Sequence, residues 1–263
     1  PPSFVALKSA QYRLKFEEFF YFQLMLARRR KHAKIQNQSS PFRKIGQYFN
    51  GFFENHMPFE LTGAQKRVLR EIRKDLGQAI QMNRLVQGDV GSGKTMVAFM
   101  SMLMAKDNGF QAAIMAPTAI LAEQHYNKIT HMAGKVGMTT CLLVGGQKKK
   151  ERTAILESIA DGSTDIAIGT HALIEDTVVF KKLGLVVVDE QHKFGVKQRA
   201  RLRQKAEPFP HNLIMTATPI PRTLAMSLYG DGEVSVIDEL PPGRTAVKAV
   251  VRGESQRLEV LGF

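Results

Sequence analysis

The eight residues from Gly88 to Thr95 restrict the fold of this chain more than any other stretch. Their sequence, GDVGSGKT, fits the pattern G-x-x-x-x-G-K-[S/T] at every fixed position. Residues 84–87 before it are typical of a short buried strand, and residues 96–105 after it of an apolar helix. Strand, loop and helix in this order predict a phosphate-binding loop, because loop N–H groups and a helix N-terminus both favour an anion. A glycine-rich turn that happens to end in Lys-Thr is the disfavoured alternative.

The residues of this loop have distinct expected roles. Its glycines allow the backbone to turn its N–H groups inward around the phosphates. Lys94 is expected to reach the β- and γ-phosphates and act in catalysis, and Thr95 to ligate Mg²⁺ through its hydroxyl. The residues predicted to contact the nucleotide are Gly88, Gly91, Ser92, Gly93, Lys94 and Thr95. The expected cofactors are therefore ATP and Mg²⁺.

A second candidate site is the pair of carboxylates Asp189 and Glu190, which directly follows the apolar residues 186–188. In an open α/β sheet, ligands collect beyond the carboxyl ends of the strands, so this pair should lie beside the phosphate loop. Asp189 is suited to hold Mg²⁺, and Glu190 to orient and deprotonate an attacking water. Two carboxylates that merely cap a helix are the alternative, which the apolar strand makes less attractive.

Net charge and composition limit the classes of partner that this chain could bind. The net charge is +13, and residues 1–60 alone carry ten basic and four acidic side chains. Such a surplus favours a polyanionic partner, above all nucleic acid. Cys141 is the only cysteine, which excludes an internal disulfide and a cysteine-based zinc site. No run approaches the roughly 18 apolar residues of a membrane span, and no signal peptide is recognisable, so a cytoplasmic location without a membrane partner is expected.

The chain divides into three predicted parts. Residues 1–57 form a helical lead-in, because aromatic and aliphatic residues recur there at three- and four-residue steps, which predicts packing against another element. Its basic run at 28–34 suits either a solvated face or phosphate contacts, and the sequence leaves both open. Residues 58–240 form the main lobe, and residues 241–263 a linker and the start of a further lobe. Because the first residue is proline, we expect the chain to be part of a longer protein.

The main lobe shows strands alternating with helices. Thr62 is a plausible N-cap for a helix that runs from Ala64 to about Ile80. Further strands are predicted at 112–116, 140–144, 165–169, 185–188 and 213–216, with helices at 119–133 and 149–160. This alternation predicts an α/β fold with a mostly parallel sheet covered by helices on both faces.

Taken together, these motifs resemble those of superfamily 2 helicases. In chain order the matching segments are 88–95, 116–124 (APTAILAEQ), 189–192 (DEQH) and 216–219 (TATP). Within the superfamily the chain most closely resembles the RecG family of branch-migrating DNA helicases, densely over residues 58–250. The segments that carry this closer resemblance are 61–65 (LTGAQ), 169–174 (GTHALI), 219–224 (PIPRTL) and 237–244 (IDELPPGR). It implies a RecA-like lobe with a P-loop.

The resemblance assigns further roles. Gln65 corresponds to a glutamine that reads adenine, a base whose edge fits the donor and acceptor of an amide. The alternative is an ordinary surface glutamine on a helix. His192, with Thr216 and Thr218, resembles a relay that senses the state of the nucleotide, although a lone histidine is more often structural.

The resemblance also implies that several loops of the main lobe contact the backbone of a DNA strand. Hydroxyl and backbone N–H groups contact phosphates without reading sequence, which suits an enzyme that slides. The residues implied are Pro117, Thr118, Gly145, Gly146, Thr170 and His171. Whether the lysines at 148–150 join them or only begin a solvated helix stays open.

A motor of this kind needs a second lobe that supplies an arginine finger, worth about 10³–10⁵ in rate for related phosphoryl transfers. We therefore expect residues 1–263 alone to bind MgATP weakly and to hydrolyse it poorly. The implied function is coupling of ATP hydrolysis to branch migration and fork reversal on branched DNA, together with the second lobe and a DNA-wedge domain. A transcription-repair coupling translocase comes second, because that family usually differs at Ser92 and Gln191. A nucleotide-gated DNA-binding module without unwinding activity is the non-enzyme alternative.

Overall fold

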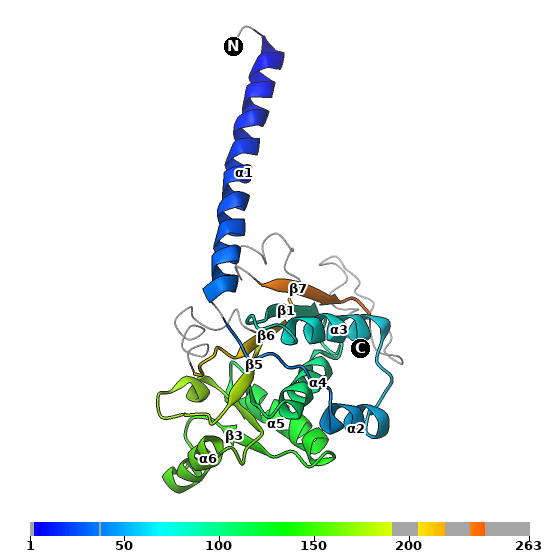
Figure 1. Cartoon of the computed structure of the whole chain (residues 1–263), viewed down its shortest axis with the longest axis vertical. Coiled ribbons are helices and arrows are strands. Elements are labelled where there is room, and N and C mark those ends of the chain that lie inside the picture. Colours follow the sequence, from blue (N-terminus) through cyan, green and yellow to red (C-terminus); the bar gives the residue numbers. More distant parts are fainter. Residues whose placement is uncertain (1–2, 37, 191–204, 219–231, 240–263) are drawn as a thin grey trace, which may run out of the picture.

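The computed structural model describes residues 3–36, 38–190, 205–218 and 232–239, and for residues 29–36 only the backbone (Figure 1). The described strands form one seven-stranded sheet in the order β3-β4-β2-β5-β6-β1-β7, and every neighbouring pair is parallel. The strands are β1 (Asn83–Gly88), β2 (Gln111–Met115), β3 (Thr140–Leu143), β4 (Ile166–Gly169), β5 (Leu183–Asp189), β6 (His211–Thr216) and β7 (Glu233–Ile237). The predicted parallel α/β sheet is confirmed, and β7 is an edge strand that the sequence analysis did not anticipate.

The helices alternate with the strands as predicted. They are α1 (Phe4–Gln36), α2 (Gln47–Asn55), α3 (Gly63–Leu76), α4 (Lys94–Asp107), α5 (Ala119–Gly134), α6 (Lys149–Asp161) and the short 3-10 helix η1 (His171–Ile174). The helix expected to reach Ile80 ends at Leu76 instead. The amide of Gly77 bonds to the Arg73 carbonyl and that of Gln78 to Asp75, which tightens the last turn, and Ile80 then pairs with Gln38.

Two hydrophobic cores lie on opposite faces of the sheet, because successive side chains of a strand point to opposite sides. In β2, Ala112 and Ile114 join the core formed with α2, α3, α4 and α5, whereas Ala113 and Met115 join the core formed with α6 and η1. Helices thus cover both faces, as the sequence predicts.

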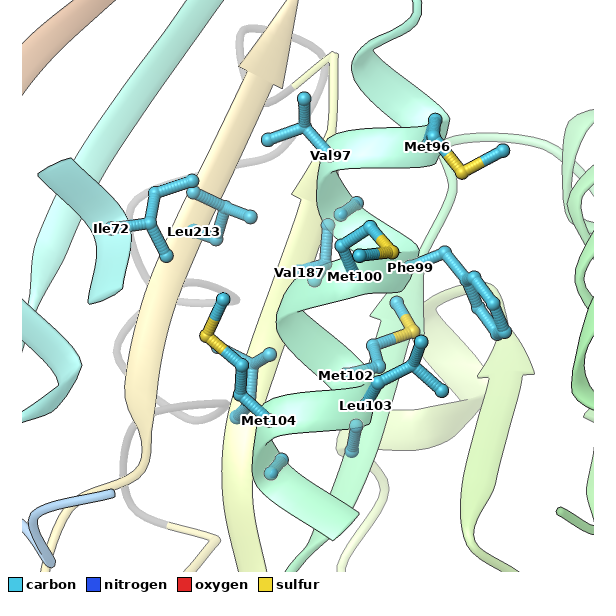
Figure 2. Close-up of a cluster of buried hydrophobic side chains, with 14 of the residues drawn as sticks. Ile72, Met96, Val97, Phe99, Met100, Met102, Leu103, Met104, Val187 and Leu213 are labelled. Atoms are coloured by element: carbon cyan, nitrogen blue, oxygen red, sulfur yellow. The ribbon is translucent and has the colours of Figure 1, made fainter. Parts of the chain in front are cut away.

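Helix α4 is buried around its whole circumference, so its sequence is apolar without an amphipathic stripe. Every residue from Met96 to Ala105 is buried. The helix packs on the sheet with one side and against α2 and α3 with others, and Figure 2 shows its side chains pointing to several sides, with Phe99 and Met96 on the side away from Ile72 and Leu213. Burial on all sides fixes the first turn of α4, which carries Lys94 and Thr95, to the sheet.

Helix α1 extends away from the lobe (Figure 1). From Phe4 to Arg28 none of its side chains is buried against the part of the chain that the structure describes, and Phe16, Phe19 and Phe20 are exposed. The packing predicted for these aromatic residues is therefore not seen within the described chain. None of the described helices is long and apolar enough to span a membrane.

The segment between α1 and α3 packs on the lobe. Phe42 and Phe52 are buried in the same core as α4, and Phe52 lies edge-on to Phe99 with ring centroids 4.9 Å apart. The predicted boundary between residues 57 and 58 stays a prediction, and residues 241–263 lie outside the described residues.

Candidate functional site

The strand order brings the candidate residues together at one edge of the sheet. Strands β5, β6 and β1 are neighbours, so their carboxyl ends present Asp189, Thr216 and the phosphate loop side by side. Asp189 is in register with Met215, and Thr216 with Gln87 of β1. Residues more than a hundred positions apart in the sequence therefore face one site.

The phosphate loop has the backbone that its glycines were expected to provide. Gly91 and Gly93 have φ values of 83° and 89°, in the left-handed region that other residues avoid. Gly93 is also the N-cap of α4. The Lys94 ammonium donates to the carbonyl oxygens of Gly88 (2.5 Å) and Asp89 (2.9 Å) and so lies folded over the loop.

Burial lowers the pKa of Lys94, and the nearby carboxylates Asp189, Glu190 and Asp89 oppose this shift. A partly desolvated ammonium interacts more strongly with an anion than one in bulk water. The side chain is therefore suited to neutralise phosphate charge.

Gln65 is fully buried beside the phosphate loop, so it is not a surface glutamine. Its amide oxygen accepts from the Thr62 amide (3.0 Å) and its amide nitrogen donates to the Ser92 carbonyl (2.8 Å). Together with the bond from the Gln65 amide to the Thr62 hydroxyl (3.2 Å), this makes a capping box at the start of α3. A Cβ on Gly93 would overlap the Gln65 amide, so the loop requires glycine there. The adenine-reading role of Gln65 stays a prediction.

Glu190 is held by two donors from the end of β6. Its backbone has φ 49°, unusual for a residue other than glycine. One carboxylate oxygen accepts from the Ala217 amide (2.9 Å) and the other from the Thr216 hydroxyl (3.3 Å). Thr216 and Thr218 share a hydrogen bond of 2.8 Å. Thr216 thus contacts Glu190 and Thr218 contacts Thr216, while His192 lies outside the described residues, so the relay stays a prediction.

His125 on α5 is a site residue that the sequence analysis missed. Its Nε2 lies 2.8 Å from Oδ2 of Asp189, and its side chain is only 10% exposed. No local sequence pattern predicts this contact, because it depends on how α5 packs beside the end of β5. A histidine seven residues after the Thr118 N-cap has no recognisable ligand spacing.

A cavity of about 800 Å³ connects these groups. Lys94, Thr95, Asp189 and Glu190 border it, and Pro58, Phe59 and α5 form other walls. Its size fits a nucleotide, and the Thr95 hydroxyl and Asp189 carboxylate are the hard oxygen donors that Mg²⁺ prefers. Among the described residues, no cluster of three or more acidic, histidine or cysteine side chains could cage a metal. In proteins that bind MgATP, Mg²⁺ is usually held by one or two protein oxygens together with water and phosphate.

The loops implied to contact DNA lie at the carboxyl ends of β2, β4 and β3, the other half of the same edge. The Ala116 amide bonds to the Gly169 carbonyl (2.8 Å) and the Thr170 amide to the Leu143 carbonyl (3.3 Å), which ties these strand ends together. The structure thereby brings Pro117, Thr118, Gly145, Gly146, Thr170 and His171 to one region. Their contact with DNA stays a prediction.

These loops combine exposed glycines with short hydroxyl side chains. Gly145 and Gly146 are exposed, and Gly146 has φ 82°. Thr118 uses its hydroxyl to cap α5 by accepting from the Leu121 amide (3.3 Å). Thr170 is buried, and its hydroxyl has no partner among the described residues. The lysines at 148–150 are exposed at the start of α6, which leaves both of their interpretations open.

The end of β7 supports the start of α3, a second feature absent from the sequence predictions. A Glu239 carboxylate oxygen accepts from the Ala64 amide (3.1 Å), and Arg67 pairs with Asp238 (2.8 Å). An anion at a helix N-terminus satisfies a free N–H and the helix dipole. Gln65 lies in the same first turn of α3 and bonds to Ser92 of the phosphate loop, so Glu239 supports that loop indirectly through α3.

Comparisons with known proteins agree on one family. The sequence model of the DEAD/DEAH box helicases matches residues 62–227. The chain is 50% identical over 257 residues to the ATP-dependent DNA helicase RecG of Synechocystis sp., covering 98% of this chain and 31% of that protein. It is 45% identical over 249 residues to RecG of Aquifex aeolicus, covering 94% and 31%. The chain therefore spans about a third of the length of these curated relatives.

A solved structure of RecG bound to a three-way DNA junction is 40% identical in sequence and superposes with a TM-score of 0.84. It is matched over 100% of this chain and 35% of that one.

Proposed function

Because the chain belongs to the DEAD/DEAH box helicase family, and within it to the RecG group, we propose that it is the ATP-binding lobe of a DNA translocase. The observation that carries the proposal is the meeting of three elements at one cavity: the phosphate loop, the Asp189-Glu190 pair and the end of β6, whose Ala217 borders the cavity and bonds to Glu190. A phosphate loop alone is compatible with many nucleotide-binding proteins. Here it lies beside a carboxylate pair suited to hydrolysis, and that pair is hydrogen-bonded to the end of the neighbouring strand β6.

The residues divide the chemistry of hydrolysis among them. Lys94 neutralises charge on the β- and γ-phosphates, and Thr95 and Asp189 would hold Mg²⁺, which would supply further neutralisation of phosphate charge. Glu190 orients the attacking water and accepts its proton. The bonds from the Ala217 amide and the Thr216 hydroxyl fix the Glu190 carboxylate in place, so little reorganisation is needed at the moment of reaction.

The partner of the lobe is branched DNA, such as replication forks and four-way junctions. The net charge of +13 supports a polyanionic partner, and the solved relative at 40% identity is described as RecG bound to a three-way junction. ATP hydrolysis would drive branch migration and fork reversal in recombination and repair. Since the chain spans about a third of its relatives' length, we assign junction recognition to a DNA-wedge domain and the arginine finger to a second motor lobe, both outside these residues.

The test uses Lys94→Ala and Glu190→Gln in the protein that contains this chain, with remodelling of a forked DNA as the readout. Both variants should lose remodelling, and Glu190→Gln should keep nucleotide affinity because it removes the base without removing a phosphate contact. Glu157→Gln is the matched control, since Glu157 is exposed on α6. Remodelling retained by either site variant refutes the assignment.

Two further outcomes separate other interpretations. ATP turnover that does not rise with forked DNA, although the DNA is bound, would favour a nucleotide-gated binding module. For residues 1–263 as an isolated polypeptide we expect weak MgATP binding and slow hydrolysis, because an arginine finger contributes about 10³–10⁵ in rate. DNA-stimulated turnover by this polypeptide at the rate of an intact helicase would contradict that expectation.

A further inference from the structure

His125 occupies a position between the two halves of the carboxyl edge. Its helix, α5, begins next to Thr118 in the loop implied to contact DNA, and two turns later His125 reaches Asp189 in the nucleotide site. Its side chain is 10% exposed and that of Asp189 is 14% exposed, so bulk water competes little with the 2.8 Å contact. A charge-assisted hydrogen bond shielded in this way is among the stronger kinds.

The two nitrogens of the His125 imidazole have different roles in this contact. Opposite a carboxylate, Nε2 carries the proton and donates, and in the neutral ring Nδ1 is then an acceptor. Nδ1 of His125 is buried and has no hydrogen-bond partner among the described residues. Within the described part of the chain the ring is therefore held through its Nε2, which engages Oδ2 of Asp189.

We propose that His125 is a positioning residue that holds the Asp189 carboxylate in the orientation needed to receive Mg²⁺ with the nucleotide. The proposal rests on the proposed function, in which Asp189 is a magnesium ligand. A carboxylate held by one outer hydrogen bond loses less rotamer freedom when it binds the ion, and such outer partners typically contribute about 10–100-fold in metal affinity. In this role His125, which also borders the cavity, acts through its bond to Asp189.

A purely structural role predicts something different. If His125 only filled space beneath α5, an apolar side chain of similar volume would serve equally well, and nucleotide binding would respond to Mg²⁺ as before. If it positions Asp189, the effect must depend on a donor at the Nε2 position. The amide nitrogen of glutamine reaches that position, whereas the shorter asparagine does not.

The experiment measures binding of a fluorescent ADP analogue as Mg²⁺ is titrated, in the protein that contains this chain and without DNA. We expect His125→Leu and His125→Asn to raise the half-saturating Mg²⁺ concentration about tenfold, and His125→Gln to restore it to within about threefold of the unmodified protein. Binding of the analogue in the presence of EDTA should be equal in all of them. Glu123→Ala, exposed on the same helix, is the control and should leave the titration unchanged.

Circular dichroism and thermal unfolding establish that each variant is folded. If the leucine variant does not fold, the comparison of asparagine with glutamine still decides, because the two carry the same amide. An unchanged Mg²⁺ titration in the asparagine or leucine variant overturns the proposal, and so does a glutamine variant that is no better than asparagine. Fork remodelling by the unmodified protein is measured separately, so a failure of the proposed function is distinguishable from a failure of this inference.

Discussion

The carboxyl edge of the sheet has two halves that are built differently. At the ends of β1, β5 and β6, side chains with defined partners surround a cavity, as in the contacts of Lys94, Asp189 and Glu190. At the ends of β2, β3 and β4, the exposed groups include glycine backbone and a short hydroxyl side chain, as at Gly146 and Thr118, and Thr170 lies buried behind them. The two halves share one sheet and one scaffold.

The difference matches two kinds of task. Phosphoryl transfer needs charges fixed in place before the reaction, because reorganisation at that moment raises the barrier. A grip on a nucleic-acid backbone that must slide needs donors that repeat along the chain and ignore the bases. We call the ends of β1, β5 and β6 the nucleotide half and the ends of β2, β3 and β4 the nucleic-acid half. Substitutions in the nucleotide half should therefore abolish ATP hydrolysis, whereas each substitution in the nucleic-acid half should lower DNA affinity by a small factor.

The largest effect is expected for Lys94→Ala in the nucleotide half. Removing an ammonium that lies over the loop should lower ATP hydrolysis at least about a hundredfold, the order seen when one preorganised electrostatic group is removed. Steady-state hydrolysis with forked DNA measures this, and binding of the same DNA should be retained. Lys66→Ala, exposed on α3, is the control. If the rate of ATP hydrolysis fell only a few-fold, the proposed difference between the two halves would be contradicted.

The contrast between the halves also explains what the sequence could and could not predict. The phosphate loop and the Asp189-Glu190 pair follow apolar strands directly, so a local pattern is enough to find them. His125 and Glu239 act across distances of 64 and 175 residues, to Asp189 and Ala64. Such contacts depend on which elements become neighbours, and no local spacing encodes that. For the same reason β7 was missed, since its identity depends on pairing with β1.

Acid should destabilise a third region, the amino edge of the sheet. His211 at the start of β6 accepts from the Met82 amide at Nδ1 (3.0 Å), and its Nε2 lies 2.9 Å from the Ser40 carbonyl oxygen. Burial lowers the pKa of His211 to about 4. Protonation would place a hydrogen on Nδ1 opposite the Met82 N–H, which is why the neutral form is favoured.

Because the pKa of His211 is lower in the folded protein, acid should reduce the free energy of unfolding. The stabilisation by neutral His211 is complete above the pKa of the unfolded chain, near 6.5, and it is lost as the pH falls from 6.5 towards 4. At pH 5 the free energy of unfolding should be lower by about 2 kcal/mol than at pH 7 through this residue alone, at 1.36 kcal/mol per pKa unit. Urea unfolding at the two pH values measures it, and His211→Gln should remove that part of the pH dependence. An equal pH dependence in the variant would exclude His211 as the cause.

A smaller, stepwise effect is expected in the nucleic-acid half. Thr170→Val keeps the volume of a buried side chain and removes a hydroxyl without a partner among the described residues. If that hydroxyl donates to a phosphate, the dissociation constant for forked DNA should rise up to about tenfold, the range of a hydrogen bond to a charged group. Hydrolysis without DNA should be unchanged. Thr153→Val on α6, which loses a hydroxyl bonded to the Lys149 carbonyl, is the matched control; an unchanged DNA affinity in Thr170→Val would remove this residue from the interface.

The smallest effect is expected for Glu239→Ala, at the outer border of the nucleotide half. Glu239 is exposed and caps α3 through a single bond to the Ala64 amide, so its loss should lower the free energy of unfolding by about 0.5–1 kcal/mol, the lower part of the range for helix caps. Urea unfolding measures this, with Glu233→Ala at the exposed start of β7 as control. Because the Gln65 bond to Ser92 and the capping box remain, nucleotide affinity should fall less than about threefold. A larger fall would mean that the contact between β7 and α3 belongs to the nucleotide half itself, and that the ordered side chains of this half extend from the cavity to the edge of the sheet.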